Sequence, residues 1–287
     1  MNYLPLAIAS PILMAVCNII QKKVVTDDKV EGHIFAVGFG LLVALLTLPF
    51  ALVFESVHIQ AIPVNVYPML LLMTILYAIA MWLFYTALKH IPVSEIVFFD
   101  SSIPIWVLAG SVLFLHESLT SYKISGVALL VSGILVAFRA FRISTWTKYH
   151  WYALVASMMY AFAYMTDKYI LNFLPPISYQ VLSFGLPSVV LLLVYKSQMH
   201  TLRYFVTSKK ARNIIWSSVF AGLSFIALYK AYALSDELSI VNPLFETKAL
   251  WTVLLGILLL KERENMAYKI AGIVLSMCGV WLSVYMS

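Results

Sequence analysis

Charged side chains are scarce in this sequence. Asp, Glu, Lys and Arg make up 11% of its 287 residues, whereas soluble domains carry roughly 25%. Hydrophobic residues make up 62%, and the mean hydropathy is +0.92. A soluble core cannot bury this much apolar surface, but helices that face lipid can display it. The composition therefore excludes an ordinary soluble domain and predicts an integral membrane protein in contact with membrane lipids.

Cysteine is also scarce. Cys17 and Cys278 both fall inside apolar segments, so we expect free thiols and no disulfide. The net charge of +6 would suit nucleic acid, but no basic run is interleaved with aromatic residues, and we expect no nucleic-acid partner. The N-terminus has neither a basic n-region nor an evident cleavage site, so the first apolar segment is expected to be retained.

Catalytic and metal-binding motifs are missing. His116-Glu117 lacks the second histidine of a zinc motif, and no nucleophile elbow, phosphate loop or dinucleotide fingerprint occurs. The six histidines scatter over loops and segment ends, which argues against metal transport. The sequence thus predicts a protein that is not an enzyme and has no cofactor. A membrane enzyme that uses Asp100 or Glu246, and a receptor or structural protein, remain as alternatives.

Long apolar segments dominate what is present. Each has about 18–23 residues, close to the ~20 that an α-helix needs to cross a bilayer. They predict an all-α integral membrane protein with ten transmembrane helices. The segments are 3–22, 33–54, 67–88, 93–115, 123–141, 151–171, 176–195, 213–234, 240–260 and 267–286.

An internal repeat organises these segments. Tyr-Lys-Ile-Ser-Gly at 122–126 recurs as Tyr-Lys-Ile-Ala-Gly at 268–272, a spacing of 146, and Lys22 matches Lys168 at the same spacing. The chain therefore divides into two five-helix halves, 1–145 and 146–287, which together form one transport domain. Five is an odd number, so the second half enters the membrane from the opposite side, and the substrate site of such an inverted repeat lies between the halves.

The basic residues predict how the chain is oriented. Of 19 Lys and Arg residues, fifteen follow the odd-numbered segments, whereas the opposite face holds only Lys123 and Lys168. The remaining two, Lys230 and Lys248, lie inside apolar segments. Because cytoplasmic loops carry the excess of positive charge, the odd loops are expected in the cytoplasm and both termini outside it.

Three charged residues lie deep inside apolar segments. Glu246 and Lys248 fall within 242–260, and Asp100 falls within 94–115, one position off register with Glu246 at a spacing of 145. A charge at the bilayer centre costs at least ~2.5–3.5 kcal/mol, so these residues predict a functional cavity flanked by the two helices. Residues two apart point to different faces of a helix, so we expect Glu246 and Lys248 not to pair with each other.

The mixture of charges suggests a substrate class. A lysine suits a substrate carboxylate, and an acid or an aromatic ring suits an ammonium group, so the pocket fits a zwitterion. The carboxylates also suit a coupling proton. The alternative is structural: an ion pair inside the bundle, and aromatic residues that only pack. The predicted substrate-binding residues are Asn18, Trp82, Tyr85, Asp100, Tyr160, Tyr164, Tyr229, Lys230, Asn242, Glu246 and Lys248.

Each half also carries a set of scaffold residues at matching places. They are Ala87, Leu88, Pro104, Leu115, Glu117, Gly126 and Gly133 in the first half, and Ala233, Leu234, Leu260, Glu262, Gly272 and Gly279 in the second. This set resembles that of the EamA-type drug/metabolite transporters. The resemblance covers almost the whole chain, and it implies a secondary transporter with ten helices in two halves. We expect the repeated glycines to allow close helix packing and Glu117 and Glu262 to anchor helix ends or loops.

Two features depart from the family pattern. Ala249 stands where Pro104 predicts a second proline, and the charge bias places the termini outside, where well-known relatives keep them inside. The expected function is alternating-access transport of a small-molecule metabolite, amino-acid-like and zwitterionic, across a bacterial inner membrane. Anionic metabolites (nucleotide sugars, sugar phosphates) and cationic drugs are the alternative substrates. The sequence leaves the direction, the coupling ion and the oligomeric state open.

Overall fold

The computed structural model describes residues 3–25, 31–55, 62–91, 93–138, 146–196, 202, 204–207, 210–260 and 265–286. Within these ranges the regular structure is entirely helical, as predicted. In the first half the helices are α1 (Leu4–Val25), α2 (Gly32–Phe54), α3 (Tyr67–His90), α4 (Val93–Asp100), α5 (Ile103–Phe114) and α6 (Ser121–Phe138), with a short 3-10 turn at Val64–Val66. In the second half they are α7 (Lys148–Ile170), α8 (Pro176–Val194), α9 (Tyr204–Thr207), α10 (Ala211–Leu234), α11 (Leu238–Glu246), α12 (Lys248–Leu260) and α13 (Met266–Tyr285).

Nine stretches of the described chain are long and apolar enough to cross a membrane. They confirm an integral membrane protein. The remaining long helix, α7, has 23 residues but carries Lys148, Asp167 and Lys168 and is less apolar. That α7 forms a tenth transmembrane span therefore stays a prediction.

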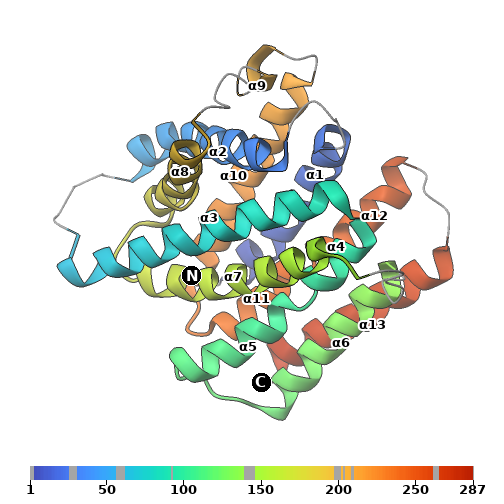
Figure 1. The fold of residues 1–287 in the computed structure, drawn as a ribbon. Helices are drawn as coiled ribbons and strands as arrows, with labels where there is room; N and C mark the ends of the chain where they lie inside the picture. Colours follow the sequence, from blue (N-terminus) through green and yellow to red (C-terminus); the bar gives the residue numbers. More distant parts are fainter. Residues whose placement is uncertain are drawn as a thin grey trace.

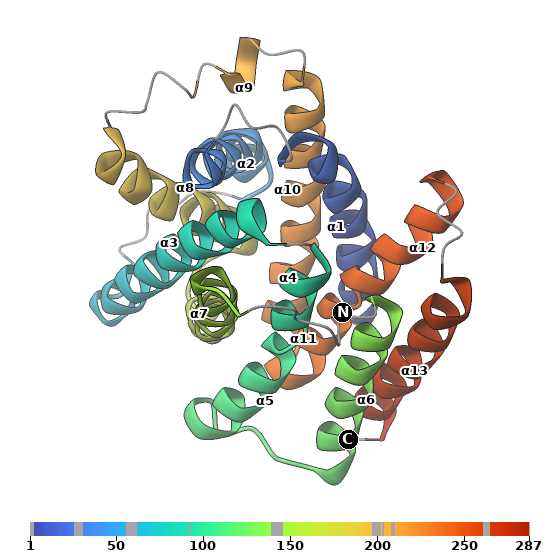
Figure 2. The ribbon, with the colours of Figure 1, turned by 45° about the vertical axis from the view of Figure 1, so that its right-hand side comes forward.

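The helices pair across the two halves (Figures 1 and 2). The most extensive contacts join α6 to α13, α2 to α8, α1 to α10 and α3 to α7. α1 and α7 occupy the same place in their halves, as do α3 and α10. Exchanging the halves therefore converts the α1–α10 pair into the α7–α3 pair and leaves the α2–α8 and α6–α13 pairs unchanged. The packing therefore follows an approximate two-fold symmetry.

The contact between α6 and α13 shows that equivalent helices run antiparallel. A Cβ atom on Gly126 would lie 2.7 Å from the carbonyl oxygen of Gly279, and one on Gly272 would lie 2.4 Å from that of Gly133. Residue numbers rise along one helix as they fall along the other. The glycines thus allow the close packing predicted for them, and the antiparallel pairing is that of an inverted repeat.

The fourth helix of each half is broken beside its acid. In the first half α4 ends at Asp100, and in the second half α11 ends at Glu246. The two acids are therefore structural equivalents 146 residues apart, which corrects the predicted one-residue offset. Pro104 explains the first break, because its ring excludes a helical bond to the carbonyl of residue 100. In the second half the Thr247 hydroxyl bonds to the Leu244 carbonyl oxygen at 2.6 Å and competes with the backbone there.

The two cysteines behave as predicted. Cys17 is buried on α1, Cys278 is exposed on α13, and both are free thiols. One of the predicted anchors, Glu262, lies outside the described residues.

Candidate functional site

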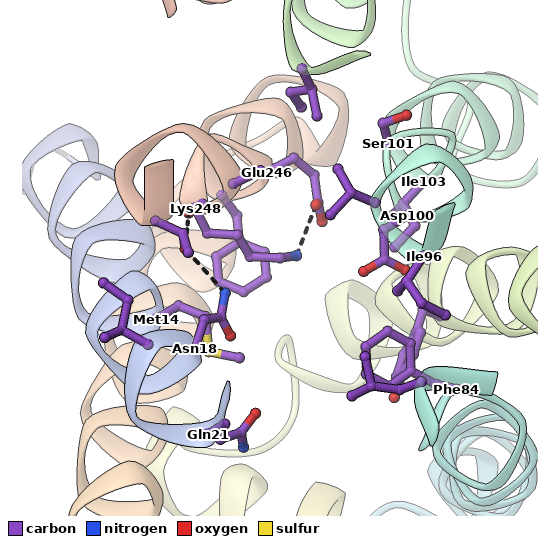
Figure 3. A pocket seen from close by; sticks show the side chains of 18 of the residues that line it. Met14, Asn18, Gln21, Phe84, Ile96, Asp100, Ser101, Ile103, Glu246 and Lys248 are labelled. Atoms are coloured by element: carbon purple, nitrogen blue, oxygen red, sulfur yellow. Dashed lines mark hydrogen bonds and ion pairs between the residues drawn. The ribbon is translucent and has the colours of Figure 1, made fainter. Parts of the chain in front are cut away.

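A cavity of about 680 Å³ lies between the two halves (Figure 3). Both broken helices contribute to its wall, together with the faces of α1, α3, α7 and α10. Eight of the eleven residues predicted to bind substrate line it: Asn18, Tyr85, Asp100, Tyr160, Tyr164, Tyr229, Glu246 and Lys248. Its volume is within the range of ~300–1,000 Å³ that is usual for small-molecule sites.

The cavity opens toward one face of the bundle. Its lining includes Gln21, Lys89 and Phe138, at the ends of α1, α3 and α6, and Asn265, which is exposed at the start of α13. All of these belong to the face with the odd-numbered connections. Among the described residues, no lining side chain comes from the connections at 115–120 or 235–237 on the opposite face.

Glu246 and Lys248 form an ion pair inside the cavity. Lys248 Nζ lies 2.8 Å from Glu246 Oε2, and the two side chains are 14% and 3% exposed. The prediction that these residues do not pair was wrong. It assumed one continuous helix, whereas the helix is interrupted between them at Thr247. The other carboxylate oxygen, Glu246 Oε1, is buried and has no hydrogen-bond partner among the described residues. One acceptor therefore remains for a ligand.

Asp100 is the second acid of the cavity. Its recorded hydrogen bond within the described chain is a long one, from Ser157 Oγ at 3.4 Å. Figure 3 shows its carboxylate facing the interior from α4, across the space from the side chains of α1. The deep part of the cavity thus holds two carboxylates and a single ammonium, Lys248, which is already paired.

Hydrogen-bond donors line the wall opposite Asp100. Asn18 Nδ2 on α1 lies 3.4 Å from Thr252 Oγ1 on α12. Gln21 Nε2, one turn further along α1, is buried and has no hydrogen-bond partner in the part of the chain that the structure describes. Lys248 lies between this wall and Glu246, with its Nζ 4.3 Å from the centre of the Phe245 ring. The two walls therefore differ in character: α1 and α12 offer amide and ammonium donors, whereas the ionised Asp100 and Glu246 can only accept.

Three predicted residues lie outside the cavity lining. Trp82 is half-buried against Tyr152, with ring centroids 6.1 Å apart. Lys230 is half-buried on α10. Asn242 is fully buried in α11, where its Nδ2 lies 3.4 Å from the Tyr232 hydroxyl.

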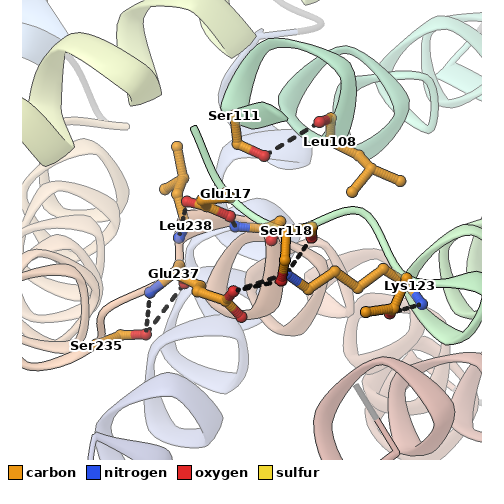
Figure 4. Close-up of polar contacts among 10 residues, drawn as sticks. Leu108, Ser111, Glu117, Ser118, Lys123, Ser235, Glu237 and Leu238 are labelled. Atoms are coloured by element: carbon orange, nitrogen blue, oxygen red, sulfur yellow. Dashed lines mark hydrogen bonds and ion pairs between the residues drawn. The ribbon is translucent and has the colours of Figure 1, made fainter. Parts of the chain in front are cut away.

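Polar contacts between the halves hold the opposite face together (Figure 4). The Glu117 carboxylate accepts the backbone N–H groups of Leu238, at 2.6 Å, and Ser239, at 3.0 Å. Glu117 therefore anchors the start of α11, as predicted. Nearby, Lys123 is 1% exposed and donates to Glu237 Oε1 at 2.9 Å. We call these residues the closed-face cluster: Glu117, Ser118, Lys123 and Glu237.

The fold brings several residues to the site that were not predicted from the sequence. Tyr77, Gln21 and Thr252 line the cavity, and Ser157 contacts Asp100. Asp167 lies behind the cavity wall and is fully buried. The sequence already indicated this residue, because Asp167 falls inside the predicted segment 151–171 and a carboxylate within a membrane span is a functional candidate by default.

Comparison with known proteins identifies the family. The sequence matches the EamA-like transporter family twice, over residues 1–139 and over residues 147–285. The chain belongs to the EamA-like transporter family. Each match covers one half, as the repeat requires, and the members of the family are transporters, not enzymes. The search of curated proteins gave no match.

A solved structure has the same fold as this EamA-like transporter. Described only as "Crystal structure of protein", it superposes with a TM-score of 0.77 and covers 98% of this chain and 96% of its own. The two sequences are 11% identical, so the likeness extends to the fold alone.

Proposed function

We propose that this EamA-like transporter moves a small zwitterionic metabolite, such as an amino acid, by alternating access. The observation that carries the proposal is the unlike character of the two cavity walls. Asp100 and the unpartnered Glu246 Oε1 suit an ammonium group, and the donors of Asn18, Gln21 and Lys248 suit a carboxylate. Buried polar atoms without partners are costly, so a ligand that satisfies them binds favourably.

The charge count argues against an anionic substrate. A sugar phosphate or nucleotide sugar needs several converging cations, whereas the deep cavity holds two acids and one paired lysine. Lys89 and Lys269 also line the cavity, but from the ends of α3 and α13 near the opening. A cationic drug is the second candidate, because the excess of one carboxylate favours an organic cation, and the tyrosines add cation–π attraction.

The direction in which the cavity opens has a consequence for the transport cycle. It opens on the face that carries most of the Lys and Arg residues. By the positive-inside rule this face is cytoplasmic and both termini lie outside. We therefore propose an inward-open state in a bacterial inner membrane, with the closed-face cluster sealing the outer side.

A matched ligand series tests the substrate class. The melting temperature of the purified protein is measured in the presence of three ligands: an amino acid, the matching amine that lacks the carboxylate, and the matching acid that lacks the amine. A ligand that binds the folded state stabilises it by RT ln(1 + [L]/Kd). Across a set of aromatic and aliphatic series, we expect the amino acid to stabilise most, the amine less and the acid least. Stabilisation by the acid alone would contradict the proposal, and equal effects of amine and amino acid would favour a cationic drug.

A further inference from the structure

Asp167 is the centre of a buried polar cluster that the proposed substrate site does not use. It lies near the end of α7 and has no solvent exposure. The Tyr77 hydroxyl on α3 donates to its Oδ2 at 2.5 Å, and the Tyr179 hydroxyl on α8 donates to its Oδ1. Tyr229 on α10 packs against Tyr179, with ring centroids 5.0 Å apart, and its hydroxyl donates to Ser183 Oγ at 3.1 Å. Two helices, α3 and α8, therefore donate hydroxyl groups to one acid on α7.

No cation of the described residues pairs with this acid. The neighbouring Lys168 turns away, and its Nζ donates to the carbonyl oxygens of Tyr232, at 2.7 Å, and Ser235 at the end of α10. An ionised carboxylate buried without a counter-charge is costly, and in practice such a group takes up a proton. Hydroxyl donors offset part of this cost, so both protonation states remain accessible at this position.

The cluster lies between the cavity and the closed face. Tyr77 and Tyr229 line the cavity, whereas Asp167 and Tyr179 lie behind that wall. Along α7, Asp167 is ten residues beyond Ser157, the partner of Asp100, and this corresponds to roughly 15 Å. The Asp167 cluster is therefore separate from Asp100. It borders the seal that must open during alternating access, because the adjacent Lys168 donates to the Ser235 carbonyl oxygen in the closed-face connection.

The internal repeat shows that only one half carries this acid. The register that aligns Lys22 with Lys168 also aligns Gln21 with Asp167. Gln21 lines the open end of the cavity as a neutral amide. The equivalent position on the closed side, Asp167, is thus ionisable where Gln21 is uncharged. The open end and the closed side of the cavity therefore differ chemically.

We propose that Asp167 is a proton-binding site that couples proton movement to the opening of the closed face. This inference rests on the transporter function proposed above. A proton from water bonds to a carboxylate oxygen of Asp167, and release to the other face reverses the step. The ionised group accepts the hydroxyls of Tyr77 and Tyr179 and holds α3 and α8 against α7. Protonation removes the negative charge that these hydroxyls stabilise, so the contacts that seal this face weaken.

The other titratable groups near α7 lie too far away or are already bound. Tyr164 on α7 and Tyr232 on α10 are further titratable groups near the cluster. The Tyr164 ring packs against Tyr77, with centroids 6.4 Å apart, and the Tyr232 hydroxyl accepts from Asn242 Nδ2 at 3.4 Å. On α4, Glu95 contacts His150, and Asp100 contacts Ser157, both toward the other end of α7. α5 presents no titratable side chain to this cluster.

Infrared spectroscopy tests proton binding without any substrate. Difference spectra between acid and alkaline pH report the carboxyl stretching band of protonated acids in purified protein. We expect a band that disappears in Asp167→Asn but persists in Asp236→Asn, the same change at an exposed acid. Spectra of Asp167→Asn that match the wild type at every pH would overturn the proposal. If Asp167→Asn fails to fold, Tyr179→Phe serves instead, and the loss of one donor to the carboxylate should move the midpoint of the band to higher pH. An unchanged midpoint would overturn the proposal.

Transport in proteoliposomes tests the coupling. The probe is a radiolabelled mixture of the common amino acids, with a pH gradient imposed in each direction in turn. One coupled proton and a gradient of one pH unit can support about tenfold accumulation in the wild type. The Asp167→Asn variant should still exchange labelled for unlabelled amino acids. It should only bring their concentrations on the two sides of the membrane to equality, so the tenfold accumulation is lost. Undiminished accumulation by Asp167→Asn would overturn the inference. If the wild type does not move amino acids at all, the proposed substrate class fails, and the infrared result still decides the role of Asp167.

Discussion

Lys123, on α6 of the first half, donates a hydrogen bond to Glu237, which directly precedes α11 of the second half. Their charged atoms are 2.9 Å apart, and the side chains are 1% and 29% exposed. The lysine also donates to the Ser118 carbonyl oxygen at 2.8 Å. The pair therefore joins the halves on the face where the cavity is closed.

The unequal burial of this pair predicts an asymmetric double-mutant cycle. Glu237→Gln leaves the buried Lys123 charge without its counter-ion and should cost on the order of 2 kcal/mol, below the ~3–5 kcal/mol of a fully buried pair. Lys123→Met keeps the apolar stem and leaves only the partly hydrated Glu237, so its cost should be smaller. The double variant should recover most of the loss of Glu237→Gln. Melting curves in detergent measure all three, and equal costs for the single variants would contradict this account.

The glycine contacts between α6 and α13 predict opposite effects of one substitution at two sites. A Cβ atom on Gly133 would lie 2.2 Å from Ser276 Oγ and 2.6 Å from the Gly272 carbonyl oxygen. Gly133→Ala should therefore force the helices apart and cost about 1–3 kcal/mol. Gly185→Ala is the matched control, because its Cβ atom would meet only Ala44 at 3.6 Å and the helix gains up to ~1 kcal/mol of propensity. Thermal melting should show a loss for the first variant and none for the second.

The orientation of the chain can be measured directly. The fifteen-to-two distribution of Lys and Arg places both termini outside the cytoplasm. A C-terminal fluorescent reporter that matures only in the cytoplasm should stay dark, while a reporter active only outside should give signal. A bright cytoplasmic reporter would instead favour the usual orientation of the family.

The sequence predicts the helices, the repeat and the deep charges, because each depends on local composition and spacing. The pairing of Glu246 with Lys248 could not be predicted, because it depends on the helix break at Thr247. Pro104 predicts a break in the first half, whereas Pro243 in the second half lies inside α11 and does not end it. The second half breaks beside Thr247, so a proline at Ala249 is not needed.

The direction in which a side chain points was equally hard to read. Tyr229 and Lys230 are adjacent on α10, and adjacent residues on a helix point about 100° apart. Tyr229 lines the cavity, so Lys230 faces elsewhere. Asn242 has a suitable position along its helix but turns toward Tyr232. The depth of a residue follows from counting along the sequence, whereas its rotation follows from tertiary packing.

The Glu246–Lys248 pair predicts that the two acids of the cavity respond differently to neutralisation. Glu246→Gln removes the counter-ion of Lys248, which is only 14% exposed. It should lower both transport and melting temperature, with a cost approaching the ~3–5 kcal/mol of a broken buried pair. Glu246→Gln combined with Lys248→Met should regain stability without regaining transport. A double variant that still transports would show that the pair only holds the helices together.

Asp100 provides the most direct test of the proposed site, because it has no ionic partner in the described chain and one long hydrogen bond, from Ser157. The amide in Asp100→Asn keeps the size and polarity of the side chain but cannot hold a substrate ammonium. The measurement is uptake of a radiolabelled amino-acid mixture by proteoliposomes containing Asp100→Asn, with a melting curve of the same preparation. We predict that uptake is abolished while the melting temperature stays within a few degrees of the wild type. Wild-type uptake by Asp100→Asn would contradict the assignment of this cavity as the substrate site.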